Sequence, residues 1–281
     1  MDEHNFEISF SNNFRGSRFM IKTITRLVGI AAIVSLMAGT PAYAVSFGFG
    51  TSGTGAAATA NFTASGTNLV VVLTNNGGDV LLPTDVLTGV FFDVVGPGGL
   101  GSVSAVLSGG SFVLYDSING AHPTGGVVGG EWAYGSGLAL PNSATEGISS
   151  SGLGVFGGPT FPGSNLADPD AIDGLQYGIT SCVDDQATGN GGITGSGGLI
   201  KCQVTFTLSG LPSEFVPDGS NITHVSFQYG TALTDANHTG DLDGGNDTGT
   251  GLDTAVPEPS SLILLGSGLL VLARAARRKL N

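Results

Sequence analysis

Positive charge is almost missing from the body of this 281-residue chain. Eight of the nine basic residues lie near the two ends, and Lys201 is the single base between Val45 and Val256. The same stretch holds 18 acidic residues, which gives it a formal charge of -17. Such a segment repels nucleic-acid phosphates and anionic lipid headgroups. The composition therefore argues against nucleic-acid binding and leaves cations or neutral polymers as partners.

Long amphipathic helices are also missing from the pattern. With 48 Gly and only 11% charged residues, the chain favours short strands and turns. Short runs rich in Val, Phe and Thr alternate with Gly, Asn, Asp and Pro, as in strands separated by turns. The predicted strands are 46–50, 57–63, 68–74, 87–95, 102–107, 111–115, 203–208 and 224–229.

The run 203–208 shows how these strands should pack. Val204, Phe206 and Leu208 fall on one side, and the polar residues between them fall on the other. We therefore predict an all-β fold, an antiparallel β-sandwich formed by residues 45–234. The Gly-rich middle at 121–198 is expected to form long loops in part.

The N-terminal end has the order of a secretion signal. Basic residues precede an apolar stretch at 27–38, and Ala42 and Ala44 supply the small residues of a cleavage site. The stretch is shorter than the about 20 residues that a membrane-spanning helix needs. We expect residues 1–44 to be a signal peptide that signal peptidase removes, with Met20 as the true start.

The C-terminal end combines three elements in a fixed order. Val256, Pro257, Glu258 and Pro259 precede an apolar stretch at 262–273, which a basic cluster follows. At about 1.5 Å per residue, twelve residues span about 18 Å of a roughly 30 Å hydrocarbon layer. The basic cluster favours the cytoplasmic side, which leaves the Pro-Glu-Pro segment outside and open to a protease.

This tail, 256–281, resembles the PEP-CTERM sorting signal. The resemblance implies a short C-terminal transmembrane helix and recognition by an exosortase, a membrane-embedded cysteine transpeptidase-like enzyme. Exosortases occur in Gram-negative bacteria that make exopolysaccharide or biofilm matrix. Cleavage near 257–259 would release the protein from the inner membrane to the cell surface or extracellular matrix. The alternative is a single-pass membrane protein with a stiff Pro-Glu-Pro linker.

Cys182 and Cys202 are the only cysteines. In an exported protein two cysteines usually pair, and we predict a disulfide. The alternative is a nucleophilic cysteine, but acidic neighbours follow Cys182 and would suppress its thiolate.

An acidic segment at 235–255 is expected to be a linker, and it contains a possible calcium site. Oxygen-bearing side chains recur with the spacing of a calcium loop around a central Gly. The candidate ligands are Asp235, Asn237, Thr239, Asp241, Asp243 and Asn246. The last position holds Asn where a calcium loop has a bidentate Glu, and a plain Asp/Gly linker would look much the same.

Other candidate chemistry is sparse. Paired carboxylates for glycoside cleavage could come from Asp168, Asp170, Asp184 and Asp185. Trp132 with Tyr134 could stack on a sugar ring, although a lone Trp usually belongs to a core. No catalytic motif is found, so we expect a non-enzymatic surface or matrix protein with a structural or adhesive role. The alternatives are a calcium-dependent carbohydrate-binding module, with exopolysaccharide as its ligand, and a secreted glycoside hydrolase.

Overall fold

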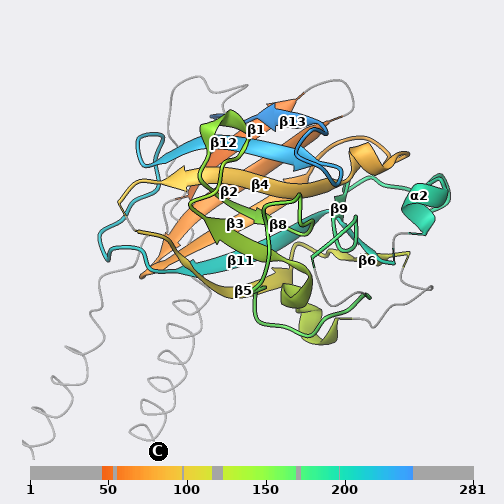
Figure 1. Ribbon diagram of the computed structural model, residues 1–281, viewed down its shortest axis with the longest axis horizontal. Helices are drawn as coiled ribbons and strands as arrows, with labels where there is room; N and C mark the ends of the chain where they lie inside the picture. The colour runs from red at the N-terminus through yellow and green to blue at the C-terminus, as the bar shows by residue number, and fades with distance from the viewer. Residues whose placement is uncertain are drawn as a thin grey trace, which may run out of the picture. The chain divides into compact units, whose positions relative to one another are not determined.

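The computed structural model describes residues 46–52, 56–96, 98–115, 123–168, 172–195 and 197–242 (Figure 1). All of them belong to one compact unit, Ala44–Val256. The predicted signal peptide and the predicted sorting tail lie outside the described residues. Within the described residues, no helix is long and apolar enough to cross a membrane.

Sheet A has six strands in the order β14-β1-β2-β3-β11-β5, all paired antiparallel. Its strands are β1 (Ser46–Ser52), β2 (Ala57–Ser65), β3 (Asn68–Asn75), β5 (Gly101–Leu107), β11 (Gln203–Ser209) and β14 (Asp241–Leu242).

Sheet B has eight strands, with the order β13-β12-β4-β9-β10-β6; in addition, β8 pairs with β4, and β7 pairs with β8. Its strands are β4 (Leu87–Val94), β6 (Phe112–Leu114), β7 (Ala133–Ser136), β8 (Glu146–Ser149), β9 (Ile179–Thr180), β10 (Leu199–Lys201), β12 (Ile222–Tyr229) and β13 (Asn237–Thr239). The pair β9 and β10 is parallel, which differs from the predicted fully antiparallel arrangement.

The helices of the described chain are short. They are the α-helix α2 (Gly191–Thr194) and the 3-10 turns η1 (Pro83–Asp85), η3 (Thr124–Gly126), η4 (Gly129–Glu131) and η5 (Pro141–Ser143). Asn190 caps α2, because its side-chain oxygen accepts a hydrogen bond from the Gly192 N–H at 2.8 Å. The all-β prediction is therefore confirmed for the described part of the chain.

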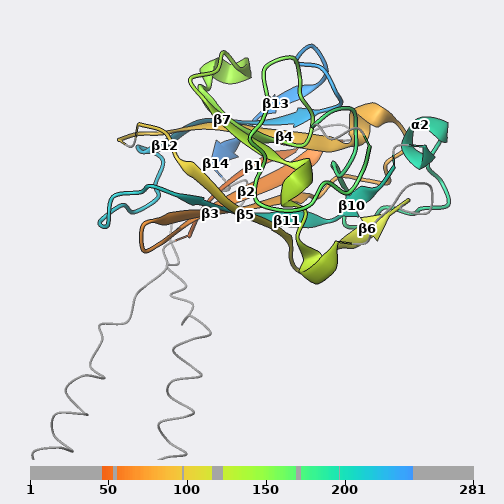
Figure 2. The same cartoon turned by 60° about the horizontal axis from the view of Figure 1, so that its bottom comes forward.

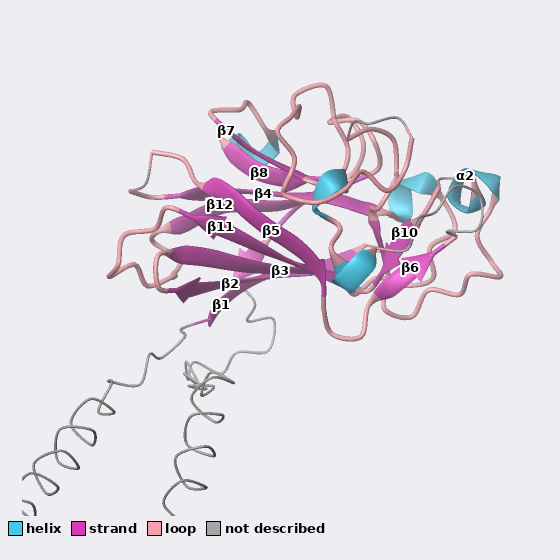
Figure 3. Ribbon diagram, turned by 90° about the horizontal axis from the view of Figure 1, so that it is seen from below, coloured by secondary structure: helices cyan, strands magenta, loops and turns pink. Residues whose placement is uncertain are grey.

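The main core lies between the two sheets, which form separate layers in Figure 3. Every second residue of β2, β3 and β11 is buried, including Phe62 and Phe206. Phe62 of sheet A meets Phe92 of sheet B edge to face, with 5.3 Å between ring centroids. Burying a side chain of this size contributes about 1.5–3 kcal/mol. The period-two pattern of the sequence thus produces the face-to-face packing.

The eight predicted strands all occur, with ends displaced by at most two residues. The Gly-rich middle forms long loops in part, as predicted, and these loops pack a second small core over the outer face of sheet B. There Phe91 stacks on Phe156 with centroids 6.0 Å apart, and Leu153 is buried beside them. Glycine permits this packing. A Cβ on Gly147 would lie 2.8 Å from the Phe91 ring.

Candidate functional site

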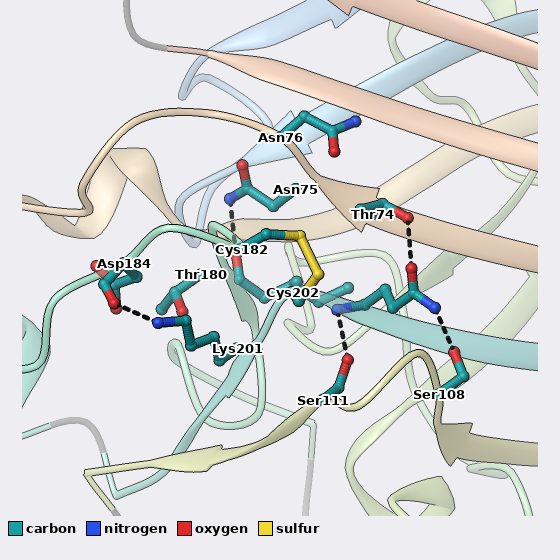
Figure 4. The surroundings of a disulfide bond; sticks show 12 residues. Thr74, Asn75, Asn76, Ser108, Ser111, Thr180, Cys182, Asp184, Lys201 and Cys202 are labelled. Atoms are coloured by element: carbon teal, nitrogen blue, oxygen red, sulfur yellow. Dashed lines mark hydrogen bonds between the residues drawn. A yellow bond between two sulfur atoms is a disulfide. The ribbon is translucent and has the colours of Figure 1, made fainter.

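A disulfide joins Cys182, in the loop after β9, to Cys202, between β10 and β11, as predicted. Backbone hydrogen bonds fix both cysteines to the end of β3, since the Cys182 N–H donates to Asn75 O and the Asn75 N–H donates to Cys202 O (Figure 4). These bonds measure 3.1 and 3.0 Å. Neither cysteine is a free thiol, which removes the alternative of a cysteine nucleophile.

The single base of the body lies in the same corner. The Lys201 ammonium donates to Asp184 O at 2.7 Å and lies 6.0 Å from the centre of the half-exposed Phe112 ring. The Lys201 ammonium therefore holds the loop that carries Asp184. Among the described residues, Lys201 is the only Lys or Arg.

Two carboxylates meet beside this loop. Asp184 is buried, and its Oδ1 accepts from the Val80 N–H at 2.9 Å. Burial raises the pKa of Asp184, and the carboxylate of Asp79 beside it raises that pKa further. Exposed Asp79 accepts from the Thr188 hydroxyl and from the Asp185 N–H, and these two donors lower its pKa. The hydrogen bonds of Asp79 and Asp184 therefore connect the loop at 79–80 to the loop at 184–188.

The carboxylates predicted for glycoside cleavage differ in their burial. Asp168 and Asp185 are exposed, whereas Asp184 is buried against Asp79. The Asp185 side chain accepts from the Ala187 N–H at 3.0 Å and so shapes its own turn. Asp170 lies outside the described residues.

Most of the predicted calcium ligands lie in a turn and in the edge strands β13 and β14. The Asp235 carboxylate closes a turn by accepting from the N–H groups of Thr231 and Ala232 at 2.9 and 3.0 Å. Asn237 and Thr239 belong to β13, which pairs with β12, and Asp241 belongs to β14, which pairs with β1.

The segment expected to be a linker therefore contributes strands to both sheets as far as Leu242. Asp243 and Asn246 lie outside the described residues. Among the residues that the structure describes, no three His, Cys, Asp or Glu side chains gather as a metal site.

Trp132 is a core residue. It is fully buried and meets Phe206 edge to face, with centroids 4.9 Å apart. The proposed stacking of a sugar on this ring is therefore wrong, because both faces are covered by protein. Tyr134 is half-buried, and its hydroxyl donates to Glu146 Oε2 at 2.8 Å and accepts from the Leu100 N–H at 3.0 Å.

Two buried carboxylates were not anticipated from the sequence. Glu131 accepts hydrogen bonds from the N–H groups of Leu166 and Ala167, which fastens the 163–167 loop to η4. Burial raises the pKa of Glu146, whose partner is Tyr134. Nothing in the sequence separates these two glutamates from exposed acids. Both carboxylates hold parts of the fold together, Glu131 through the 163–167 loop and Glu146 through Tyr134.

The residues with a recognisable function lie in the tail. Val256, Pro257, Glu258 and Pro259, and the candidate cleavage residues Ala42 and Ala44, are all outside the described residues. The described chain is an acidic all-β domain, and the tail follows it as a sorting segment. Residues 255–279 match the family model of the PEP-CTERM protein-sorting motif.

The chain therefore carries a PEP-CTERM protein-sorting motif at 255–279. The motif implies export, processing by an exosortase and membrane-associated sorting toward the cell surface. No curated protein and no solved structure matches the chain. The match covers the tail alone, so the role of the β-domain has to be argued from its own residues.

Proposed function

We propose that the β-domain is a non-enzymatic component of the extracellular matrix, with a structural or adhesive role in a biofilm or exopolysaccharide layer. The observation that carries this proposal is the sorting motif at 255–279, placed after an acidic domain whose regular secondary structure is almost wholly β-strand. Signal peptidase would act first, after Ala44. The exosortase would then act at the Pro-Glu-Pro segment and free the domain from the inner membrane.

The chemistry of the described residues supports a structural role. The buried carboxylates are engaged by loops of their own domain, and both cysteines form the disulfide. A disulfide withstands the oxidising conditions outside the cytoplasm. The strong negative charge keeps separate copies soluble and apart until a partner is met.

Intact-mass measurement on the protein from its native host tests the sorting route. We expect a species that begins near Val45 and ends near the Pro-Glu-Pro segment, recovered outside the cells. The variant Pro257→Ala/Glu258→Ala/Pro259→Ala should keep its tail and stay with the inner membrane. The matched variant Pro212→Ala/Glu214→Ala changes the same residue types in an exposed loop and should be processed normally. A full-length tail in every sample would show a membrane-anchored protein instead.

The matrix role is tested with a deletion strain. We expect its matrix to lose cohesion, measured as the shear stress that detaches the film, and expect the wild-type gene to restore it. Purified protein should release no reducing ends from polysaccharides. Turnover that disappears in Asp184→Asn or Asp185→Asn would replace this proposal with a glycoside hydrolase.

A further inference from the structure

Charge is unevenly divided between the two sheets. The strands β1, β2, β3, β5 and β11 contain no Asp, Glu, Lys, Arg or His. The described acidic residues lie in sheet B, in the loops and in the short edge strand β14. Solvated surfaces of soluble domains normally mix charges of both signs. An uncharged sheet face is therefore unusual in a domain of formal charge -17.

The strand register arranges the outward side chains of sheet A into cross-strand rows. One row contains Asn61, Val72, Thr205 and Val106, and the next contains Thr63, Val70, Thr207 and Ser104. Paired residues point to the same side of a sheet, and the residues between them, such as Phe62, Val71 and Phe206, fill the core. We call the surface formed by these eight residues the neutral face.

The neutral face keeps contact with solvent. Each of its eight residues is partly exposed, and sheet A forms the lower layer in Figure 2. The opposite outer face, that of sheet B, is covered where Phe156 and Leu153 pack over Phe91. The domain therefore buries one outer face under its own chain and presents the other as a plane of hydroxyl, amide and valine groups.

We propose that the neutral face binds an uncharged polysaccharide, an inference that rests on the proposed matrix function. Thr and Ser hydroxyls and the Asn amide both donate and accept hydrogen bonds, as sugar hydroxyls do. A neutral chain can approach without desolvating a charge, whereas the acidic surroundings repel an anionic polymer. The valines and threonine methyl groups supply apolar contact for the C–H faces of the sugar rings.

A second copy of this chain fits the neutral face less well. Four strands about 4.8 Å apart and two rows of side chains about 6.8 Å apart give roughly 260 Å² for the face. A stable protein interface buries about 800 Å² on each partner. The face also lacks the Trp, Tyr and Arg side chains that carry most binding energy between proteins. Its size and composition suit repeated hydrogen bonding along a polymer.

Affinity electrophoresis of the exported protein tests this proposal. Native gels would contain hydroxyethylcellulose or dextran as neutral polymers, or alginate as a polyanion. We expect the wild type to be retarded by at least one neutral polymer and not by alginate. The variant Asn61→Asp/Thr207→Asp removes two donors and places two charges on the face, which should weaken binding about tenfold.

The matched variant is Asn190→Asp/Ser213→Asp, which adds the same two charges at exposed positions outside the neutral face. The substitution Asn190→Asp keeps an acceptable helix cap, and we expect this variant to be retarded like the wild type. Thermal unfolding should show that both variants are folded. Equal retardation of the two variants, no retardation by either neutral polymer, or retardation by alginate alone would overturn the proposal.

Analytical ultracentrifugation of the same samples measures whether the protein self-associates. A wild-type dimer that dissociates in Asn61→Asp/Thr207→Asp would assign the neutral face to a second copy and overturn polysaccharide binding. Intact mass separates this inference from the sorting route. A correctly processed protein that does not bind neutral polymers contradicts polysaccharide binding at the neutral face alone. An unprocessed protein contradicts the proposed function.

Discussion

Asp79 and Asp184 each hold the loop that carries the other. The Asp79 carboxylate accepts from the Asp185 N–H at 2.9 Å, and Asp184 Oδ1 accepts from the Val80 N–H at 2.9 Å. Their environments are unequal, because Asp184 is only 2% exposed whereas Asp79 faces water. Asp184 Oδ2 is buried and receives no hydrogen bond. The same pair of carboxylates therefore combines a favourable contact with an unfavourable buried charge.

The raised pKa of Asp184 predicts how stability changes with pH. Because the folded state favours its protonated form, Asp184 destabilises the fold as pH rises through its raised pKa. Asp184→Asn keeps the acceptor for Val80 and adds a donor beside Asp79. We expect the variant to be more stable than the wild type at pH 8, by about 1 kcal/mol or 2–4 °C in Tm. The difference should shrink toward acidic pH.

Thermal melts from pH 4 to pH 8 measure this effect. Asp185→Asn is the matched control, because it removes the neighbouring exposed carboxylate and keeps an acceptor for Ala187. Its Tm difference from wild type should stay small and nearly constant. An Asp184→Asn variant that is less stable than wild type at pH 8 would contradict the buried-charge argument.

The disulfide predicts a second effect on stability. The two cysteines are 20 residues apart, and closing a loop of that length stabilises a fold by about 3 kcal/mol in the chain-entropy model. Cys182→Ser/Cys202→Ser should lower the urea midpoint accordingly. Reductant should bring the wild type to the midpoint of this variant and leave the variant unchanged. A wild-type midpoint that equals that of the variant without reductant would show that the bond contributes nothing.

Close backbone packing at η4 predicts a third effect. A Cβ on Gly130 would lie 2.1 Å from Ser164 O, so the loop held by Glu131 would have to move. We expect Gly130→Ala to destabilise the domain by about 1–3 kcal/mol, as overpacking does. At exposed Gly157 a Cβ meets nothing within 4 Å. Gly157→Ala should therefore be neutral or slightly stabilising in urea unfolding, and equal losses in the two variants would refute the steric explanation.

The strands β2, β3 and β11 could be predicted because apolar residues recur in them with period two over seven or more residues. The run containing Val204, Phe206 and Leu208 is buried at these positions and open at the residues between them. Strands such as β9, with two residues, are too short to show any period. Strand β9 forms because its backbone pairs with β10 and β4, and the sequence does not show which strands will lie beside it.

The acidic segments show a second limit of sequence reasoning. The pairing of Asn237 with β12 and of Asp241 with β1 extends the backbone there, and the spacing of these residues in the sequence does not display that pairing. The partners of Glu131 lie 35 and 36 residues away in the chain. Contacts over such separations depend on the tertiary fold. The disulfide was predictable because only two cysteines were present to pair.

Trp132 gives the last prediction, because it is the only Trp in the chain. Its ring is fully buried between Phe206 and the rest of the main core, so its emission should be blue-shifted and poorly quenched by acrylamide. If polysaccharide binds at the neutral face, the core does not change, and saturating hydroxyethylcellulose should leave the Trp132 spectrum unaltered. Denaturation in urea provides the control, since exposure of the ring should shift the emission to the red and restore quenching. A spectrum that shifts with polymer in the folded protein would place the sugar against Trp132 and contradict the core assignment.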